Sequence, residues 1–554
     1  MSFAQGTPTV PSIVSASNIF LVGNTTSGTA LSVQQLGAGG TVASFSNATG
    51  ASLVSINSAC QLVPSGSGAV ATNTAVGSNA LGANTTGGGN TAVGAGAMQN
   101  NTGGVNNTAV GTNAMLNNTT GGGNTAVGQN AMNANTGGIQ NTAVGQGAML
   151  NNTTGNSNTA VGQAAMQTNT GGNYNTAVGQ AAMQTNTTGS ANAALGYQAL
   201  YQNTTGQNNT AVGYAAMNVN TTGQNNTAVG NLSMQNNNSG QNNVAVGSFA
   251  MQNNTTGNNN TAVGQGAMQN NTGGYQNTAV GQLALQNNTT GYLNTAVGLG
   301  AMVSNTGGYN NTAVGQQAMS QNTTGTQNTA VGSVSLFLNL TGTNNSAFGQ
   351  GAMNQNTGGT NNTAVGFQAL YYGTTGSNNV CIGYNTGTVI TTGSGNVVIG
   401  SSGNSSSGTV SNEVTIYNGT NLCRFQGGAT SWSFTSDSRD KTNVSSIPVG
   451  INFINALRPV SYQWDRRDWY DNKQPDGSKV DPNFSIGFIA QEVDEAVQNS
   501  GYTDILKRLL YKNDPENLML SETNLIPILV KAVQELSARV EALEALGASA
   551  STPQ

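Results

Sequence analysis

A short unit with two apolar positions repeats along most of the chain and reads roughly N-T-A-V-G-x-x-A-M-x-x-N-T-T-G-x-x. Its first apolar position recurs at every seventeenth residue without one insertion, which makes nineteen equal steps and therefore twenty copies. Repeats of this length are typical of solenoids, in which successive coils stack on one another. The repeated positions are Val76, Val93, Val110, Val127, Val144, Val161, Val178, Leu195, Val212, Val229, Val246, Val263, Val280, Val297, Val314, Val331, Phe348, Val365, Ile382 and Ile399.

The constant spacing argues against disorder, because a disordered segment tolerates insertions that would break the register of stacked coils. The first position stays apolar in every copy, so we expect it to form an interior column. A second apolar column follows five residues later and runs from Leu81 and Met98 to Leu370. Ala precedes it in most copies, with Ser233 and Ser335 as exceptions.

Each copy is long enough for two short strands and two turns. Thr-Ala-Val is strand-like, and we expect T-G-G or T-T-G to form a turn in which Gly takes a positive φ. Asn residues at equivalent positions are expected to stack as side-chain amide ladders. One slender coil buries little apolar area, so we expect three chains to pack together in a mostly β fibre.

Charge separates the chain into two different parts. No Asp, Glu, Lys or Arg occurs before Glu413, so all 13 basic and 18 acidic residues lie from that position onward. The acidic balance and the lack of a basic stripe exclude a nucleic-acid partner. No apolar run reaches the length of a membrane span, and the opening segment MSFAQGTPTVPSIVSASNIF does not resemble a secretory signal. We therefore expect folding in the host cytoplasm, without membrane insertion.

Other chemistry is sparse in this sequence. There is no His, and Cys60, Cys381 and Cys423 are too scattered for a disulfide framework, so we expect neither a metal nor a cofactor. The chain before Glu413 contains no carboxylate side chain, which excludes an enzyme that cleaves glycans with paired carboxylates. The many N-x-T triplets formally match glycosylation acceptors, but turn chemistry explains them better.

One serine and one lysine stand close together after the repeats. Ser436 precedes Lys441 by five residues. A Ser beside a Lys can form a nucleophile and base pair when burial or nearby cations lower the pKa of the Lys. Taken alone, T-S-D-S is much more typical of a turn or helix cap than of a catalytic pair. Ser438 is the alternative nucleophile.

Four ordered motifs resemble the C-terminal intramolecular chaperone of phage endosialidase tailspikes and related fibres. The first is Thr435-Ser436-Asp437 with Arg439, Lys441 and Asn443. The others are LRPVSYQW (457–464), GFIAQEV (487–493) and LIPILVKAVQEL (525–536). Separately, the N-T-A-V-G-x-x-A unit is similar to the head repeats of trimeric autotransporter adhesins, which form β-rolls in trimers.

The chaperone resemblance implies trimer formation followed by autoproteolysis in cis, with no external substrate. It places the cut between Thr435 and Ser436, with Ser436 as nucleophile and Lys441 as general base. The positions that support the motif are Asp437, Arg439, Asn443, Gly487, Gln491 and Glu492.

The end of the chain predicts a helix over 522–546. Ile526, Val533 and Val540 alternate with Leu529, Leu536 and Leu543 at the spacing of a heptad seam, which predicts a coiled coil. The alternative is an amphipathic helix that packs on its own domain.

Four segments follow from these patterns. Residues 1–70 are expected to be an N-terminal attachment segment with a short β module, and 71–402 a β-solenoid or β-roll shaft. Residues 403–435 form a β bridge, and 436–554 a small α+β chaperone domain.

Function follows from this order of segments. We expect a homotrimeric tail or capsid fibre of a virion. Its N-terminus would bind a virion protein, and the fibre would contact a host surface receptor or glycan. The alternative is a cell-surface trimeric adhesin with the same repeat fold, which requires an export signal and an anchor.

Overall fold

The computed structural model describes strands 41–46, 52–57 and 62–63, then residues 70, 72–420, 422–426, 433–434, 441–471, 473–512 and 518–550. The chain divides into two compact units, Met1–Thr435 and Ser436–Gln554, and each is described by itself. Positions 1–40 lie outside the described part, together with the predicted attachment segment. The expected β module contains the antiparallel strands β1 (Thr41–Ser46), β2 (Ser52–Asn57) and β3 (Leu62–Val63).

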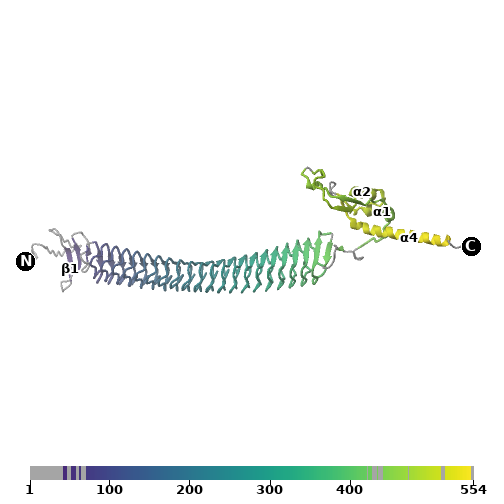
Figure 1. Cartoon of the computed structure of the whole chain (residues 1–554). Coiled ribbons are helices and arrows are strands. Elements are labelled where there is room, and N and C mark those ends of the chain that lie inside the picture. The colour runs from purple at the N-terminus through teal and green to yellow at the C-terminus, as the bar shows by residue number, and fades with distance from the viewer. Residues whose placement is uncertain are drawn as a thin grey trace, which may run out of the picture. The chain divides into compact units, whose positions relative to one another are not determined.

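The first unit is a β-solenoid in which every coil spans one copy of the repeat and contributes one short strand (Figure 1). Each strand pairs in parallel and in register with the strand one coil before it, as Thr91 does with Thr74. The strands are β4 (Thr74–Val76), β5 (Thr91–Val93), β6 (Thr108–Val110), β7 (Thr125–Val127), β8 (Thr142–Val144), β9 (Thr159–Val161), β10 (Thr176–Val178), β11 (Ala193–Leu195), β12 (Thr210–Val212), β13 (Thr227–Val229), β14 (Val244–Val246), β15 (Thr261–Val263), β16 (Thr278–Val280), β17 (Thr295–Val297), β18 (Thr312–Val314), β19 (Thr329–Val331), β20 (Ser346–Phe348), β21 (Thr363–Val365), β22 (Val380–Ile382) and β23 (Val397–Gly400).

The expectation of two strands per coil was wrong, because the segment of the second apolar column is not a strand. Its backbone turns through left-handed conformations, such as the φ of +51° at Met98 and +54° at Met302. Successive coils are nevertheless joined there by backbone hydrogen bonds, such as Met132 N–H to the carbonyl of Ala114 at 2.8 Å. The coil is therefore one strand and a long turn-rich return.

The second apolar column is buried, as predicted. Met115 and Met132 are 0% exposed, as are the Ala residues before them. The exceptions Ser233 and Ser335 are buried as well. The third component of the core is the central Ala of each strand, for example Ala109. Long Met and small Ala side chains together fill a narrow interior.

The first apolar column is not interior, and that prediction was wrong. Val144 is 36% exposed, Phe348 42% and Leu195 51%. The reason is the alternation of side chains along a strand, because the buried central Ala turns its two neighbours outward. We call this exposed column, which holds every seventeenth residue from Val76 to Ile416, the valine ladder.

Two ladders of Asn run through the interior, as predicted. In one, Asn118 Nδ2 donates to Asn101 Oδ1 at 2.7 Å, and the same bond recurs coil after coil. In the other, the backbone N–H of Asn209 donates to Asn192 Oδ1 at 2.9 Å and its Nδ2 donates to the carbonyl of Gly223 at 2.9 Å. These bonds give the buried amides the partners that they need.

Glycine supports the coil in a different way from the one predicted. The T-T-G glycine has no positive φ; it is required for space, since a Cβ on Gly121 would lie 2.4 Å from Asn118 Oδ1. The glycine after each strand takes the positive φ, +132° at Gly213. A Cβ there would also lie 2.6 Å from the carbonyl oxygen of Gly230 in the next coil.

The in-register pairing continues one coil beyond Ile399, where the sequence pattern ends. Ile399 pairs with Ile416 of β24 (Glu413–Tyr417), so part of the predicted bridge completes one more coil. β24 then pairs antiparallel with β25 (Leu422–Gln426), and β25 with β26 (Ser433–Phe434). This meander covers the last parallel strand, so its edge is not open to further pairing.

The second unit is small and mixes helices with strand pairs. Val449, Phe453, Val493, Val497, Leu506, Leu525 and Ile528 belong to its core. No helix in the described part of the chain combines the length and hydropathy that a membrane span requires. The elements are α1 (Ile451–Ala456), β27 (Val460–Gln463), a 3₁₀ turn (Arg467–Trp469), β28 (Phe484–Gly487), α2 (Ala490–Asn499), α3 (Thr503–Leu506), β29 (Leu510–Tyr511), β30 (Met519–Leu520), a 3₁₀ turn (Glu522–Leu525) and α4 (Ile526–Ala550).

Candidate functional site

The predicted cleavage site falls largely outside the described residues. The residues outside the description include Thr435, Ser436, Asp437 and Arg439. The catalytic pair of Ser436 and Lys441 therefore stays a prediction. Of the first motif, Lys441 and Asn443 are described, and both are exposed. Asn443 has a φ of +55°, a left-handed turn conformation that Asn adopts more readily than most residues.

The structure brings together the two motifs that sequence reasoning placed at 457–464 and 487–493. β27 and β28 pair antiparallel, with Val460 opposite Gly487 and Tyr462 opposite Ser485. A Cβ on Gly487 would lie 3.2 Å from Glu522 Oε1 and 3.4 Å from the hydroxyl of Tyr462. Gly487 therefore leaves room for the side chains of Tyr462 and Glu522 at the end of β28.

An ion pair joins the same two motifs. Arg458 Nε donates to Glu492 Oε2 at 3.0 Å, and its Nη2 donates to Glu492 Oε1. These hydrogen bonds, followed by the charge of the guanidinium, hold the pKa of Glu492 below its usual range. Glu492 thus ties the start of α2 to the segment before β27. Gln491 beside it is exposed.

Sequence reasoning missed a cap on α1 that comes from the terminal helix. Glu535 Oε2 accepts a hydrogen bond from the backbone N–H of Ile451 at 2.9 Å, and a carboxylate suits a helix N-terminus. A Cβ on Gly450 would lie 2.4 Å from that oxygen, so this contact needs glycine. The two residues of the bond are 84 positions apart, and no local pattern announces such a contact.

The described residues of the second unit leave the heptad seam of α4 uncovered. Ile526 is 57% exposed, Val533 61% and Leu543 67%, whereas Ile528 and Ala532 are buried against the unit. The helix therefore packs on its own domain through one face and leaves the seam exposed. This arrangement is compatible with both predictions, an amphipathic helix on its own domain and a coiled coil between chains.

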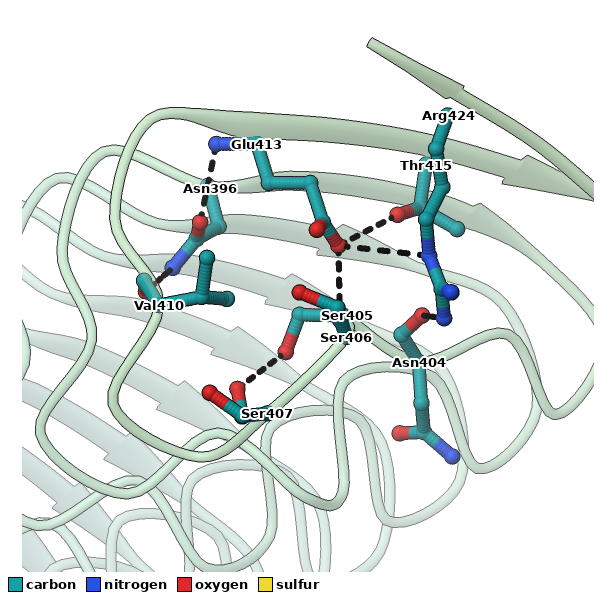
Figure 2. A network of polar contacts seen from close by, with 9 residues as sticks. All are labelled: Asn396, Asn404, Ser405, Ser406, Ser407, Val410, Glu413, Thr415 and Arg424. Carbon is teal, nitrogen blue, oxygen red and sulfur yellow. Dashed lines mark hydrogen bonds and ion pairs between the residues drawn. The ribbon is translucent and has the colours of Figure 1, made fainter. Parts of the chain in front are cut away.

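A second polar site closes the end of the solenoid (Figure 2). Glu413 is 1% exposed, and its Oε1 accepts hydrogen bonds from the N–H of Ser406 at 2.7 Å and the hydroxyl of Thr415 at 3.0 Å. Arg424 Nε lies 3.5 Å from the same oxygen, and Arg424 Nη2 donates to the carbonyl of Asn404 at 3.2 Å. We call these residues the shaft-end cluster.

The sequence held a signal for the shaft-end cluster. Glu413 is the first charged residue of the chain, and it stands one repeat after Asn396, in the position of an Asn ladder. A charge that enters a buried column requires a partner, and Arg424 is that partner.

These features define a class of protein, a long β-solenoid shaft that is followed by a separate small α/β domain. Comparison with known families specifies the second part: residues 436–502 match the family described as chaperone of endosialidase. This confirms the predicted chaperone, whose presence implies trimer formation. The match begins at Ser436, where the second compact unit also begins. Comparisons with curated proteins and with solved structures gave no match.

Proposed function

We propose that the chain is a structural fibre of a virus or phage particle that contacts the host surface. The observation that carries this proposal is the position of the chaperone match at 436–502, after a long solenoid that contains no charged residue before Glu413. In this proposal the fibre folds in the host cytoplasm, binds a virion protein at its N-terminus, and meets a host receptor or glycan along the shaft.

The chaperone solves a problem of register. Coils of nearly identical sequence can pair equally well after a shift of one whole repeat, so three such chains have many wrong alignments. Long-range parallel pairing is also slow to form. A domain that trimerises before the shaft folds would align all three chains at one end.

The chaperone then leaves by cutting itself off. Ser436 Oγ adds to the carbonyl carbon of Thr435, and Lys441, as the general base of the proposed dyad, accepts the hydroxyl proton. The C–N bond breaks as Lys441 returns the proton to the nitrogen of Ser436, which leaves an ester between the two parts. Water hydrolyses the ester, so that the shaft ends with the carboxylate of Thr435 and the released domain keeps Ser436 at its new amino terminus.

Intact-mass measurement of the freshly folded full chain tests this step. We expect a fragment that begins at Ser436, which Ser436→Ala and Lys441→Ala abolish and Ser438→Ala leaves intact. A single uncut species of the unaltered chain under native folding conditions would exclude the cleavage. Placement in the particle is tested separately, by immunogold labelling of virions with antibodies against the shaft and against residues 436–554. The shaft antibody alone should label mature particles.

A further inference from the structure

The valine ladder is an apolar surface that no described part of the chain covers. Val161 is 37% exposed, Val263 38% and Ile399 39%, and each lies directly after a buried residue at the centre of its strand. The residue before that centre, Thr in most coils, faces the same side because side chains alternate along a strand. The outer face of the strands therefore presents one row of Thr and one row of Val.

No other exposed column of the described shaft is apolar throughout. Two residues after the ladder, most coils carry a polar side chain, such as Gln146 and Gln163. A stack of three rings, Tyr275, Tyr292 and Tyr309, has centroids 4.8 Å apart but covers only three coils. The ladder alone stays apolar from β4 to β24.

The size of this face suits a stable interface. Specific interfaces contain roughly 20–30 residues a side and are less charged at their centre than at the rim. The ladder supplies one partly exposed apolar side chain in every coil, and the Thr row lies beside it. Covering such a line of side chains is favourable in proportion to the apolar area that leaves water.

The regular step of the ladder decides what can cover it. A partner must offer matching apolar groups at the rise of one coil over the whole length of the shaft, and a second copy of this chain does so. In an aligned symmetric assembly each side chain meets its own copies, so a charge would meet like charges. The absence of charge before Glu413 removes that repulsion.

We infer that the valine ladder is the surface through which three copies of the shaft pack in register, with the ladder side chains around a common axis. The number three rests on the proposed function, through the chaperone domain, whereas the surface follows from the shaft itself. The inference also explains why the column is apolar although a single chain leaves it exposed.

Disulfide cross-linking tests this interface. Val161→Cys places a thiol on the ladder, and the matched control Thr154→Cys places one on the return segment of the coil, seven residues earlier and close to half a coil away. The background carries Cys60→Ser, Cys381→Ala and Cys423→Ser; Ala suits position 381 because Ala364 occupies the same place one coil earlier. Light scattering gives the number of chains in each assembly.

We expect both variants to form trimers. Oxidation of Val161→Cys should give covalent dimers, with one chain of each trimer left unlinked. Oxidation of Thr154→Cys should give no covalent dimers. Trimers in which Thr154→Cys links and Val161→Cys does not would place the interface on another face. A monomeric shaft would overturn the inference altogether. Cleavage before Ser436 is read from the mass of the same samples, so failure of the proposed processing is distinguished from failure of the interface.

Discussion

Glu413 donates its backbone N–H to Asn396 Oδ1 at 3.0 Å, the same bond that Asn396 makes to Asn379 one coil earlier. Glu413 thus takes the place of the next Asn in the ladder. Asn396 also donates its Nδ2 to Asn379 Oδ1 at 3.0 Å, and a carboxylate cannot repeat that bond. The ladder ends here for a chemical reason, at the coil where the antiparallel meander begins.

Removing the cation of the shaft-end cluster should loosen this end of the shaft. Arg424→Met leaves the carboxylate of Glu413 buried without its charged partner. A buried group that loses its partner costs about 1–3 kcal/mol, so we expect the free energy of local opening to fall by about that amount. Hydrogen exchange of the amides in β24 and β25 measures it, and those of a mid-shaft strand such as β12 should be unchanged.

The double variant Glu413→Gln with Arg424→Met serves as the control. Its neutral amide can still accept the hydrogen bonds from Ser406 and Thr415, and no buried charge remains, so protection should return. Equal loss in the single and double variants would show that Arg424 acts through packing alone. Unchanged exchange in both would mean that the cluster does not hold the shaft end.

Two glycines with positive φ should differ in their tolerance of substitution. Gly213→Ala adds strain at a φ of +132° and forces a Cβ to 2.6 Å from the carbonyl oxygen of Gly230. Strained backbone alone costs about 1–3 kcal/mol, and the clash adds to it. We expect a lower thermal midpoint of the shaft by circular dichroism, with hydrogen exchange fastest around β12.

Gly123→Asn is the matched substitution. Gly123 has a φ of +68°, and no atom lies nearer than 3.7 Å to a Cβ built there. The equivalent position already holds Asn106 at a φ of +56° and Gln140 at +58°. We therefore expect no loss of stability. If Gly213→Ala were tolerated as well as Gly123→Asn, the glycine after each strand would not be a steric requirement of the stack.

The sequence was sufficient to predict the features of the fold that depend on the period of the repeat. A constant step without insertions defines stacked coils, and it placed Met115 and the Asn ladders in columns that the structure confirms. The same pattern could not tell which of two adjacent apolar residues faces inward. In Thr-Ala-Val, the alternation of one short strand buries Ala109 and exposes Val110, and apolar character alone assigns both to a core.

Contacts between residues far apart in the sequence were the second kind of feature that the sequence could not predict. The cap that Glu535 provides for Ile451 follows from how α1 meets α4, which no motif encodes. The pairing of β27 with β28 was likewise not predicted, because the motifs gave only their order along the chain. Glu413 is different, because its place in the Asn column was readable from the repeat, although its partner Arg424 was not.

The ion pair between Arg458 and Glu492 should make the stability of the second unit depend on pH. The hydrogen bonds from Arg458 lower the pKa of Glu492 from the ordinary value of 4.5. The stabilisation is therefore complete above that value and is lost as the pH falls through the lower pKa of the folded state. Protonated Glu492 no longer attracts the guanidinium.

Thermal unfolding of Glu492→Gln and Arg458→Gln, compared with the parent at neutral and acidic pH, measures this contribution. Ser436→Ala keeps the domain attached, and Trp464 and Trp469 report on it by fluorescence. We expect each variant to unfold at a lower temperature than the parent at pH 7, and the difference to disappear once the pH is below the lowered pKa of Glu492. The double variant should lose no more than either single one, because both remove the same interaction. A difference that persists at low pH would assign the effect to packing of the side chains instead of the ion pair.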